Sequence, residues 1–352
     1  MNPNKKDHTA FRERLAKTLQ LFAKRRQSTL QIEKKPDSIV ILARECYGDC
    51  IMLTPLIGTL RREYPDLSIV IIAFSRIIFN FFSADPNVTA VYHAKREMKR
   101  YVKEILTKKF DILFNPKDHP STHFLIQSQL INARHKVGHF NPYHEGLFDH
   151  LITMSPDTHE SEKNLSVLQL INQAALKNPC KPYLPPMPVS PETAAFLETI
   201  PAGRYIAINI SAGHTGGRRT TGQWNRLIQD FPCETFIILS APAELAQKRQ
   251  IEEPHPNVLA SPSTRNIYEV GEIVKKLKLL VTPDTSLVHI AACYNTPILA
   301  LYRKRLADRT QFAPLSTQQQ IIISPTPDVI DIDPTQVTTA LRELLTVMST
   351  QC

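Results

Sequence analysis

A proline-rich segment divides this chain of 352 residues into two halves of similar length. Residues 178–191 hold six prolines in fourteen positions, and proline removes a backbone donor and blocks helices. On both sides of this segment, short β-branched runs alternate with amphipathic stretches of helical periodicity. Such alternation is typical of parallel, doubly wound sheets. The sequence therefore predicts an α/β protein with two such domains, at 36–180 and 181–352, preceded by an N-terminal arm at 1–35.

The apolar runs and their periods give the expected elements. In the first half we expect strands at 38–43, 67–74, 110–116 and 135–140, and helices at 51–64, 97–109 and 161–177. In the second half we expect strands at 205–210, 235–240, 278–282, 297–302 and 318–324, and helices at 222–230, 266–276, 285–294 and 334–348. The last helix is a candidate to pack back on the first domain.

The arm is strongly basic. Residues 1–35 contain ten Lys and Arg against three acids, which is +7 of the formal net charge of +9. Phe11, Leu15, Leu19 and Phe22 follow helical spacing, with basic residues on the other faces. This pattern favours an amphipathic helix on an anionic membrane surface; a solvated helix, or one packed on the body, is the alternative. Nucleic acid fits less well, because no interleaved aromatics or nucleic-acid motif is present.

Six scattered cysteines form no CxxC pair. Neither a zinc knuckle nor a thioredoxin motif is therefore indicated, and free thiols in a reducing cytoplasm are expected. The N-terminus lacks the long apolar core of a signal peptide. No apolar run approaches the roughly 20 residues that a membrane span needs.

A first polar cluster follows the strand expected at 38–43. In open α/β sheets, ligands bind where the carboxyl ends of strands meet helix starts. Gly48 allows a ligand to approach the backbone closely, and Thr54 lies a helical turn beyond it. Asp49 is either a plain helix N-cap or a general base that takes a proton from an acceptor hydroxyl.

A polar loop opens the second half of the chain. Residues 209–224 follow an expected strand and contain Gly213, Thr215, Arg218 and Arg219. Glycine-rich backbone can present N–H groups to a phosphate, which the two arginines would neutralise. The alternative is a surface loop without a ligand.

The late strand at 278–282 leads into Asp284, Thr285 and Ser286. These residues suit a helix N-terminus, where free N–H groups and the dipole favour a diphosphate. His289, one turn further on, is either a contact to the same ligand or a core residue. Glu244 either binds a nucleoside ribose or stabilises the first turn of its helix.

A metal site is not expected. Asp331 and Asp333 form a DxD pattern, but beside a proline near the C-terminus. The histidines at 135, 139, 144 and 150 lack the i,i+4 helical pairing of a zinc site.

Four stretches together resemble glycosyltransferase family 9, the ADP-heptose:lipopolysaccharide heptosyltransferases. They are residues 44–72, 209–228, 238–245 and 281–302. The last stretch, VTPDTSLVHIAACYNTPILALY, closely matches the family signature D-[ST]-G-x-x-H-x-A-A-x-x-x-x-P. Three departures are evident. Gly222 stands where the family usually has a lysine two residues before the tryptophan, and Ser286 replaces the signature glycine. The glycine that the family has after the late strand is missing, because Tyr302 leads into Arg303, Lys304 and Arg305.

The resemblance implies the GT-B fold, with two Rossmann-like domains facing a cleft. It implies an inverting, metal-free transfer from a nucleotide sugar such as ADP-heptose to a lipid A–core acceptor. Asp49 falls on the proposed catalytic base, with Gly48 and Thr54 placed beside the acceptor. Asp284 and His289 fall on the nucleotide-sugar site, with Thr285 and Ser286 at the phosphate.

The expected location is cytoplasmic, at the inner leaflet of the inner membrane through the basic arm. No cofactor other than the nucleotide-sugar co-substrate is expected. Two alternatives stay open. The departure at Gly222 favours an inactive family member that binds a sugar nucleotide or lipid in a regulatory or assembly role. The basic arm leaves room for a nucleic-acid-binding protein.

Overall fold

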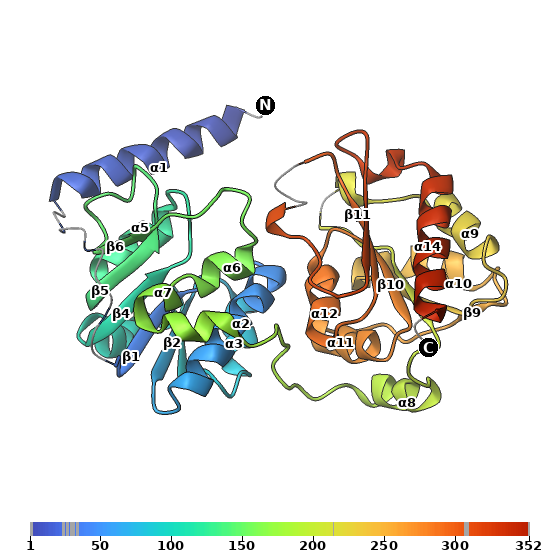
Figure 1. The fold of residues 1–352 in the computed structure, drawn as a ribbon, viewed down its shortest axis with the longest axis horizontal. Helices are drawn as coiled ribbons and strands as arrows, with labels where there is room; N and C mark the ends of the chain where they lie inside the picture. Colours follow the sequence, from blue (N-terminus) through green and yellow to red (C-terminus); the bar gives the residue numbers. More distant parts are fainter. Residues whose placement is uncertain are drawn as a thin grey trace. The chain divides into compact units, whose positions relative to one another are not determined.

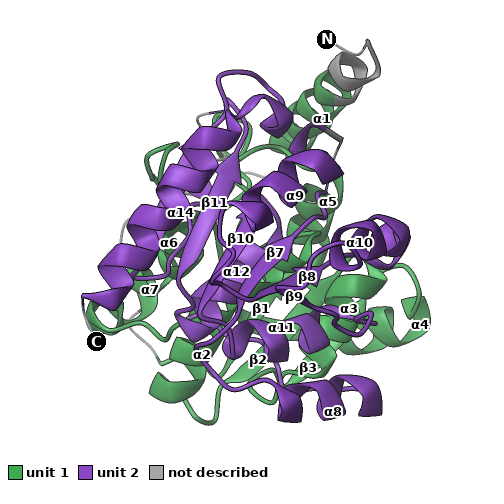
Figure 2. Ribbon diagram, turned by 90° about the vertical axis from the view of Figure 1, so that its right-hand side faces the viewer, with its two compact units in different colours: residues 1–181 green, residues 182–352 purple. Residues whose placement is uncertain are grey.

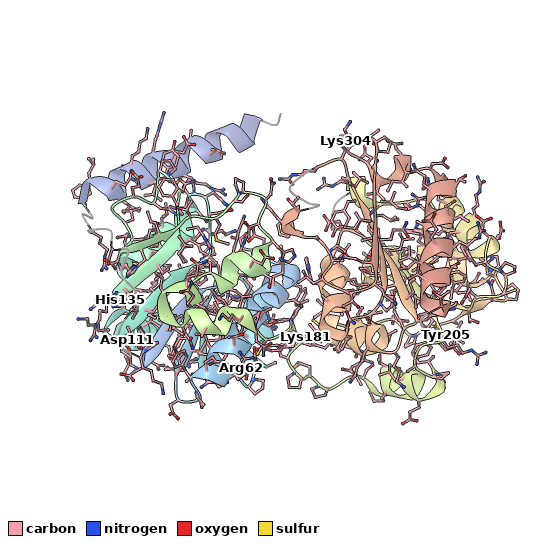
Figure 3. All side chains as sticks on the ribbon, in the orientation of Figure 1. Arg62, Asp111, His135, Lys181, Tyr205 and Lys304 are labelled. Carbon is pink, nitrogen blue, oxygen red and sulfur yellow. The ribbon has the colours of Figure 1, made fainter. Side chains whose placement is uncertain are left out.

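The computed structural model describes residues 3–22, 25, 28, 32, 35–213, 215–305 and 310–350. The chain forms two compact units, Met1–Lys181 and Pro182–Cys352 (Figures 1 and 2). Figure 3 labels Lys181, the last residue of the first unit, which lies within the proline-rich segment. Each unit has its own six-stranded sheet with every described pairing parallel.

The first unit carries the sheet of order β3-β2-β1-β4-β5-β6. Its strands are β1 Ser38–Leu42, β2 Ser68–Ala73, β3 Ala90–His93, β4 Lys109–Asn115, β5 Asn132–His139 and β6 His150–Ile152. Its helices are α1 Pro3–Phe22, α2 Tyr47–Glu63, α3 Arg76–Ser83, α4 Met98–Tyr101, α5 Thr122–Leu130, α6 Glu160–Leu165 and α7 Leu168–Ile171, with a π turn η1 Val102–Leu106 and a 3-10 turn η2 Gln173–Lys177.

The second unit carries the sheet of order β12-β11-β10-β7-β8-β9. Its strands are β7 Ile206–Asn209, β8 Phe236–Leu239, β9 Val258–Leu259, β10 Leu279–Pro283, β11 Ile298–Tyr302 and β12 Gln319–Ile323. Its helices are α8 Pro191–Thr199, α9 Thr221–Gln229, α10 Leu245–Glu252, α11 Ile267–Lys275, α12 Ser286–Tyr294 and α14 Pro334–Ser349, with 3-10 turns η3 Thr215–Gly217, η4 Pro242–Glu244 and η5 Val329–Asp331.

Both sheets have the same strand order when each is counted from its own first strand. The order is 3-2-1-4-5-6, the arrangement of dinucleotide-binding domains. The chain reverses direction across the sheet between β1 and β4 in the first unit, and between β7 and β10 in the second. Ligands of such sheets bind in the crevice at this switch point, beyond the carboxyl ends of the two strands. The fold therefore indicates one binding edge in each unit.

The strands form apolar cores because their β-branched side chains are buried on both faces of a parallel sheet. Strands β10 and β11 are buried over their whole length. Trp224 of α9 belongs to the core of the second unit, together with Leu341 and Leu344 of α14. Helix α14 thus packs on the sheet of its own unit.

Helix α1 packs on the first unit along one face. Ala16 is fully buried with Leu125 and Phe148, and Leu19 packs against the same cluster. Gln20 Nε2 donates to the carbonyl oxygens of residues 142 and 145, at 2.9 and 3.0 Å. The apolar stripe of the sequence is therefore divided, because Leu19 faces the body while the two phenylalanines of the stripe are exposed.

The exposed apolar side chains of α1 are Phe11, Leu21 and Phe22. Lys24, Arg26 and Lys34 of the basic arm lie outside the described residues. Among the helices that the structure describes, none is long and apolar enough to cross a membrane.

Three expected helices differ from the structure. The helix expected at 97–109 is the short α4 followed by the π turn η1, and residue 109 already belongs to β4. The helix expected at 161–177 is broken into α6, α7 and η2. The break follows α6, where the Ser166 hydroxyl donates to the Lys163 carbonyl at 2.7 Å, a local bond that competes with helix propagation. The helix expected at 51–64 starts earlier, at Tyr47, and this places Asp49 within its first turn.

Candidate functional site

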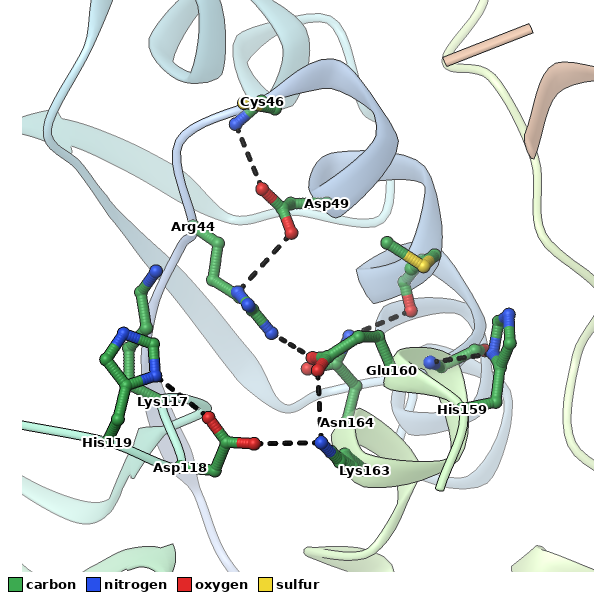
Figure 4. Close-up of polar contacts among 12 residues, drawn as sticks. Arg44, Cys46, Asp49, Lys117, Asp118, His119, His159, Glu160, Lys163 and Asn164 are labelled. Carbon is green, nitrogen blue, oxygen red and sulfur yellow. Dashed lines mark hydrogen bonds and ion pairs between the residues drawn. The ribbon is translucent and has the colours of Figure 1, made fainter. Parts of the chain in front are cut away.

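Asp49 lies at the carboxyl edge of the first sheet, where β1 leads into α2. Cys46 is the N-cap of α2 and Asp49 is the third helical residue, so Asp49 is not the N-cap itself, but its side chain caps the helix start as the N3 member of a capping box. The Cys46 N–H donates to Asp49 Oδ2 at 3.2 Å, and Arg44 Nε lies 3.3 Å from Asp49 Oδ1 (Figure 4). The side chain is 16% exposed. The carboxylate is thus anchored at the helix start and still reaches the surface, which keeps Asp49 a candidate general base.

The two residues expected beside the acceptor differ in position. Gly48 is half-buried in the first turn of α2. Thr54 is fully buried, and its hydroxyl donates to the Ile51 carbonyl at 2.7 Å. Because α2 is buried on nearly all its faces over this stretch, the interpretation of Thr54 as an acceptor ligand is wrong.

A group of ionic side chains lies behind Asp49. Arg44 contacts Glu160 of α6 as well as Asp49. Lys163 Nζ lies 3.2 Å from Glu160 Oε1 and 2.8 Å from Asp118 Oδ2 (Figure 4). This group could not be predicted from the sequence, because Arg44 and Glu160 are 116 positions apart and no spacing pattern links them.

Asp118 follows β4, on the other side of the switch point from Arg44. His119 Nδ1 lies 2.9 Å from Asp118 Oδ1. The hydrogen bonds from His119 and Lys163 hold the pKa of Asp118 well below its usual range. The edge between β1 and β4 is therefore lined by ionised groups.

The corresponding edge of the second unit joins the ends of β7 and β10. Asn209 Nδ2 donates to Thr282 Oγ1 at 2.9 Å and to Thr285 Oγ1 at 3.3 Å. Thr285 is the N-cap of α12 and accepts from the Leu287 N–H at 3.3 Å. Asp284 and Ser286 flank it, half-buried. The helix start expected at these residues is confirmed.

The polar loop after β7 places Arg218 beside Glu244. Arg218 Nη2 lies 3.0 Å from Glu244 Oε1, and the Ser211 hydroxyl donates to the same carboxylate. Ser211 Oγ in turn accepts from the Ala241 N–H at 2.6 Å. Glu244 makes no capping hydrogen bond to α10, so this carboxylate is held by the polar loop rather than by its helix.

Arg219 has a structural position. It is 3% exposed, and its Nη1 donates to the carbonyls of Val329 and Ile332 at 3.3 and 3.2 Å. Its guanidinium lies 5.5 Å from the Trp224 ring centre, and burial lowers its pKa to about 10. The expectation that Arg219 neutralises a phosphate is therefore wrong.

The remaining expected residues of the second unit are placed as follows. His289 is buried in α12. Gly213 is exposed, with open space around the position of a Cβ. Thr215 begins η3, and its side chain lies outside the described part. Figure 3 labels Lys304, in a basic run that follows β11 and was not assigned from the sequence.

The DxD carboxylates are engaged locally. Asp331 accepts from the Thr326 hydroxyl at 2.5 Å, and Asp333 accepts from the Thr335 N–H at 2.9 Å as the N-cap of α14. Within the described residues, no group of three or more His, Cys, Asp or Glu is placed to hold a metal ion.

Twin sheets of dinucleotide-binding order, each with a polar edge at its switch point, define a two-unit α/β protein of the GT-B type. The chain belongs to glycosyltransferase family 9 (heptosyltransferase), whose model matches residues 98–339, and it is a glycosyltransferase. A second model, of a family of unknown function, matches residues 8–167.

Relatives and solved structures agree with this assignment. The chain is 23% identical over 277 residues to lipopolysaccharide heptosyltransferase 3 of Escherichia coli, which covers 73% of this chain and 80% of the relative. The structure of the E. coli ADP-heptose lps heptosyltransferase II has a TM-score of 0.66 at 18% identity, covering 89% of this chain and 99% of that one. The E. coli heptosyltransferase WaaC with ADP has a TM-score of 0.65 at 15% identity, covering 87% and 99%.

The family resemblance, the enzyme class and the α/β, GT-B type of fold are thereby confirmed. The match at 98–339 contains Arg218, Glu244 and Asp284 but begins after Asp49. The cleft between the domains stays a prediction, as do the roles of the site residues other than Thr54 and Arg219.

Proposed function

We propose that this protein transfers a heptose, or a related sugar, from ADP-heptose to the core of lipopolysaccharide, with inversion at the anomeric carbon. The names of the relatives support the choice of donor and acceptor, since they include a lipopolysaccharide heptosyltransferase and a homologue solved with ADP. The observation that carries the proposal is the equivalent position of the two polar edges, each at the switch point of a sheet of the same order.

The proposed reaction is a single displacement. Asp49 takes the proton of an acceptor hydroxyl, and the oxygen forms a bond to the anomeric carbon while the bond to the diphosphate oxygen breaks. Because the attack comes from the face opposite the leaving group, the configuration inverts. The diphosphate leaves as the nucleotide, and the carboxylate of Asp49 retains the proton.

The charge on the leaving diphosphate needs stabilisation in the second unit. The N-terminus of α12 at Thr285 and Ser286 supplies free N–H groups and a favourable dipole. Arg218, which is 53% exposed, supplies an accessible positive charge in the polar loop after β7. Glu244 is 11% exposed and lies 3.0 Å from Arg218. We assign the ribose of the nucleotide to Glu244 and its phosphates to Arg218. His289, one turn further along α12, is proposed to lie beside the nucleotide sugar.

The basic arm is proposed to hold the enzyme on the anionic inner leaflet of the inner membrane. The face of α1 that carries Ala16 packs on the first unit, which leaves Phe11, Leu21 and Phe22 exposed. An apolar surface flanked by basic residues suits the headgroup region of anionic lipid. This position would bring the enzyme to its lipid acceptor.

The test is transfer of sugar from ADP-heptose to lipopolysaccharide purified from a mutant that lacks core heptose. Removal of a general base usually costs about 10²–10⁴-fold in turnover, so Asp49→Asn should lose activity on this scale. It should keep its affinity for ADP by calorimetry, because the donor residues lie in the other unit. The exposed Asp66 offers a control, Asp66→Asn, on the connection after α2.

Mass spectrometry of the product identifies the sugar, and NMR of its anomeric proton reports the configuration. An Asp49→Asn enzyme with most of its turnover would remove Asp49 from the mechanism. Wild-type protein that binds ADP without transferring any sugar would favour the inactive family member instead.

A further inference from the structure

Five charged side chains, of which Asp49 is the first, form a continuous chain, and their signs alternate. The order is Asp49, Arg44, Glu160, Lys163 and Asp118, each in ionic contact with the next (Figure 4). The chain crosses the switch point of the first sheet, since Arg44 follows β1 and Asp118 follows β4. Helix α6 supplies the two central members.

The central members are the most deeply buried. Glu160 and Lys163 are each 2% exposed, whereas Asp118 is 32% exposed. A buried charge is costly unless it is paired and hydrogen-bonded. The buried charges of Glu160 and Lys163 are therefore stable only while their ionic partners are present. Glu160 meets this condition by contacting two cations, Arg44 and Lys163.

Helix α6 is fixed against the helix that carries Asp49. Asn164 Nδ2 donates to the Met52 carbonyl of α2 at 3.0 Å. The His159 ring accepts from the Ser161 N–H at 3.1 Å and caps the start of α6. The position of Glu160 relative to α2 is therefore set by packing, and Arg44 is held between two anchored carboxylates.

A guanidinium with one carboxylate partner gives that partner its full positive charge. Here the charge of Arg44 is divided, because Nε faces Asp49 and Nη1 faces Glu160. Asp49 is therefore oriented by Arg44 without being fully neutralised by it. This balance suits a carboxylate that must accept a proton.

We propose that Arg44 and Glu160 are positioning residues for Asp49: Glu160 holds the guanidinium of Arg44, and Arg44 orients the Asp49 carboxylate and sets its strength as a base. The inference rests on the proposed function, in which Asp49 accepts the proton. The other ionisable groups near Asp49 are Cys46 and Cys50 on its own helix and Lys117 after β4, which also interact with it electrostatically.

The two partners have opposite charges, so their removal should move the pH dependence of transfer in opposite directions. In Glu160→Gln the whole charge of Arg44 acts on Asp49, which favours its ionised form. We expect the acid limb of kcat/KM to shift down by roughly 0.5–1 pH unit, with a lower kcat from the weaker base. In Arg44→Gln the acid limb should shift up by about 1 pH unit. The exposed Glu162 of α6 gives a matched control, Glu162→Gln, with no shift.

Arg44→Lys separates charge from orientation. Lysine keeps the positive charge but offers one ammonium where arginine uses two nitrogens of a rigid fork. We expect an acid limb close to the wild-type position, a kcat lower by about 10-fold from poorer alignment, and an unchanged KM for ADP-heptose. Lysine should thus rescue the pH profile of Arg44→Gln but not the rate.

A second readout does not depend on activity. The pKa of the Cys46 thiol is raised, mainly by partial burial and further by Asp49, whereas Arg44 lowers it. Alkylation of Cys46 by iodoacetamide, followed by peptide mass spectrometry, should therefore slow in Arg44→Gln and accelerate in Asp49→Asn. The exposed Cys233 of the second unit is the internal reference. Glu162→Gln should leave the Cys46 rate unchanged.

The outcomes distinguish the two proposals. If Asp49→Asn is inactive but Glu160→Gln and Arg44→Gln both leave the acid limb unmoved, or shift it in the same direction, the positioning role is wrong and the proposed function stands. If wild-type protein transfers no sugar, the proposed function fails. If Asp49→Asn is active, transfer stands but Asp49 is not the base, and unchanged Cys46 labelling in Arg44→Gln would overturn the electrostatic link as well. Thermal unfolding and ADP affinity establish that each variant is folded.

Discussion

The guanidinium of Arg218 lies 3.0 Å from the carboxylate of Glu244 at the edge of the second sheet. The adjacent Arg219 is buried in the core, where its guanidinium lies beside the Trp224 ring. Two neighbouring residues of the same type therefore have different surroundings, one at the proposed donor site and one in the core. This contrast allows a prediction with a built-in control.

Arg218→Ala should weaken nucleotide binding, whereas Arg219→Ala should destabilise the fold. Arg218→Ala should weaken ADP binding by roughly 10-fold, because one charge-assisted contact is lost, while the free energy of unfolding changes by less than about 0.5 kcal/mol. Arg219→Ala should destabilise the fold by about 2–4 kcal/mol, since two buried carbonyls lose their donor. Calorimetry and urea unfolding measure the two effects. Unchanged ADP affinity in Arg218→Ala would remove Arg218 from the site.

Gly222→Lys should introduce the lysine that the family usually has before its tryptophan. Gly222 is exposed in the first turn of α9, and a Cβ there meets only Thr220 Oγ1, at 3.9 Å. Replacing a helical glycine should stabilise the fold by about 0.5–1 kcal/mol. The new charge should tighten ADP binding several-fold by calorimetry. The uncharged Gly222→Gln is the control, and equal ADP affinity in both variants would show that the position does not reach the donor.

His139 should make the fold sensitive to acid. Burial lowers its pKa from 6.5 to about 4, so between these values the unfolded chain binds the proton that the folded chain resists. Stability contributed by neutral His139 is therefore full above pH 6.5 and lost as the pH falls toward 4, by about 2 kcal/mol between pH 6.5 and 5. Urea unfolding at both pH values should show that His139→Leu loses less stability than wild type. The same replacement at the exposed His123 should leave the difference unchanged.

The exposed apolar residues of α1 should govern membrane binding. We expect wild-type protein to float with vesicles of phosphatidylglycerol and phosphatidylethanolamine, and the double variant Leu21→Ser/Phe22→Ser to bind at least about 10-fold more weakly, because apolar burial is lost. Salt at about 0.5 M should weaken wild-type binding through charge screening. Val347→Ser removes an exposed apolar side chain of α14 and serves as control. Equal flotation of all three proteins would exclude the arm as the anchor.

We further expect transfer to proceed without a divalent metal. The carboxylates of Asp331 and Asp333 are engaged with Thr326 and Thr335, which argues against their use as a DxD ligand pair. Excess EDTA should change the rate by less than about twofold, and Asp331→Asn should behave as wild type. Loss of activity in EDTA that Mg²⁺ restores would contradict this proposal.

Much of the fold could be predicted from the sequence, because its strands are short apolar runs between turn residues. The runs that became β1, β2, β7, β8, β10 and β11 were all expected, as was the start of α12 at Thr285. The start of α2 was placed too late because Cys46 is not a usual N-cap residue.

Side-chain direction was harder to predict than element position. Arg219 was assigned to phosphate because a loop sequence does not show which of two adjacent arginines faces inward. Thr54 was assigned to the acceptor because the period of α2 does not reveal that the helix is covered on nearly all faces. The contact of Arg44 with Glu160 joins distant parts of the chain and depends on tertiary packing alone.

The central strands β1, β2, β7, β8, β10 and β11 are almost wholly apolar and buried, while the proposed chemistry lies in the segments that follow the strands. The scaffold is thus insulated from the residues that select a sugar. Substitutions such as those at Gly222 and Ser286, which lie in the first turns of helices, can therefore accumulate with little loss of fold stability. Donor preference can change in evolution while the fold is kept.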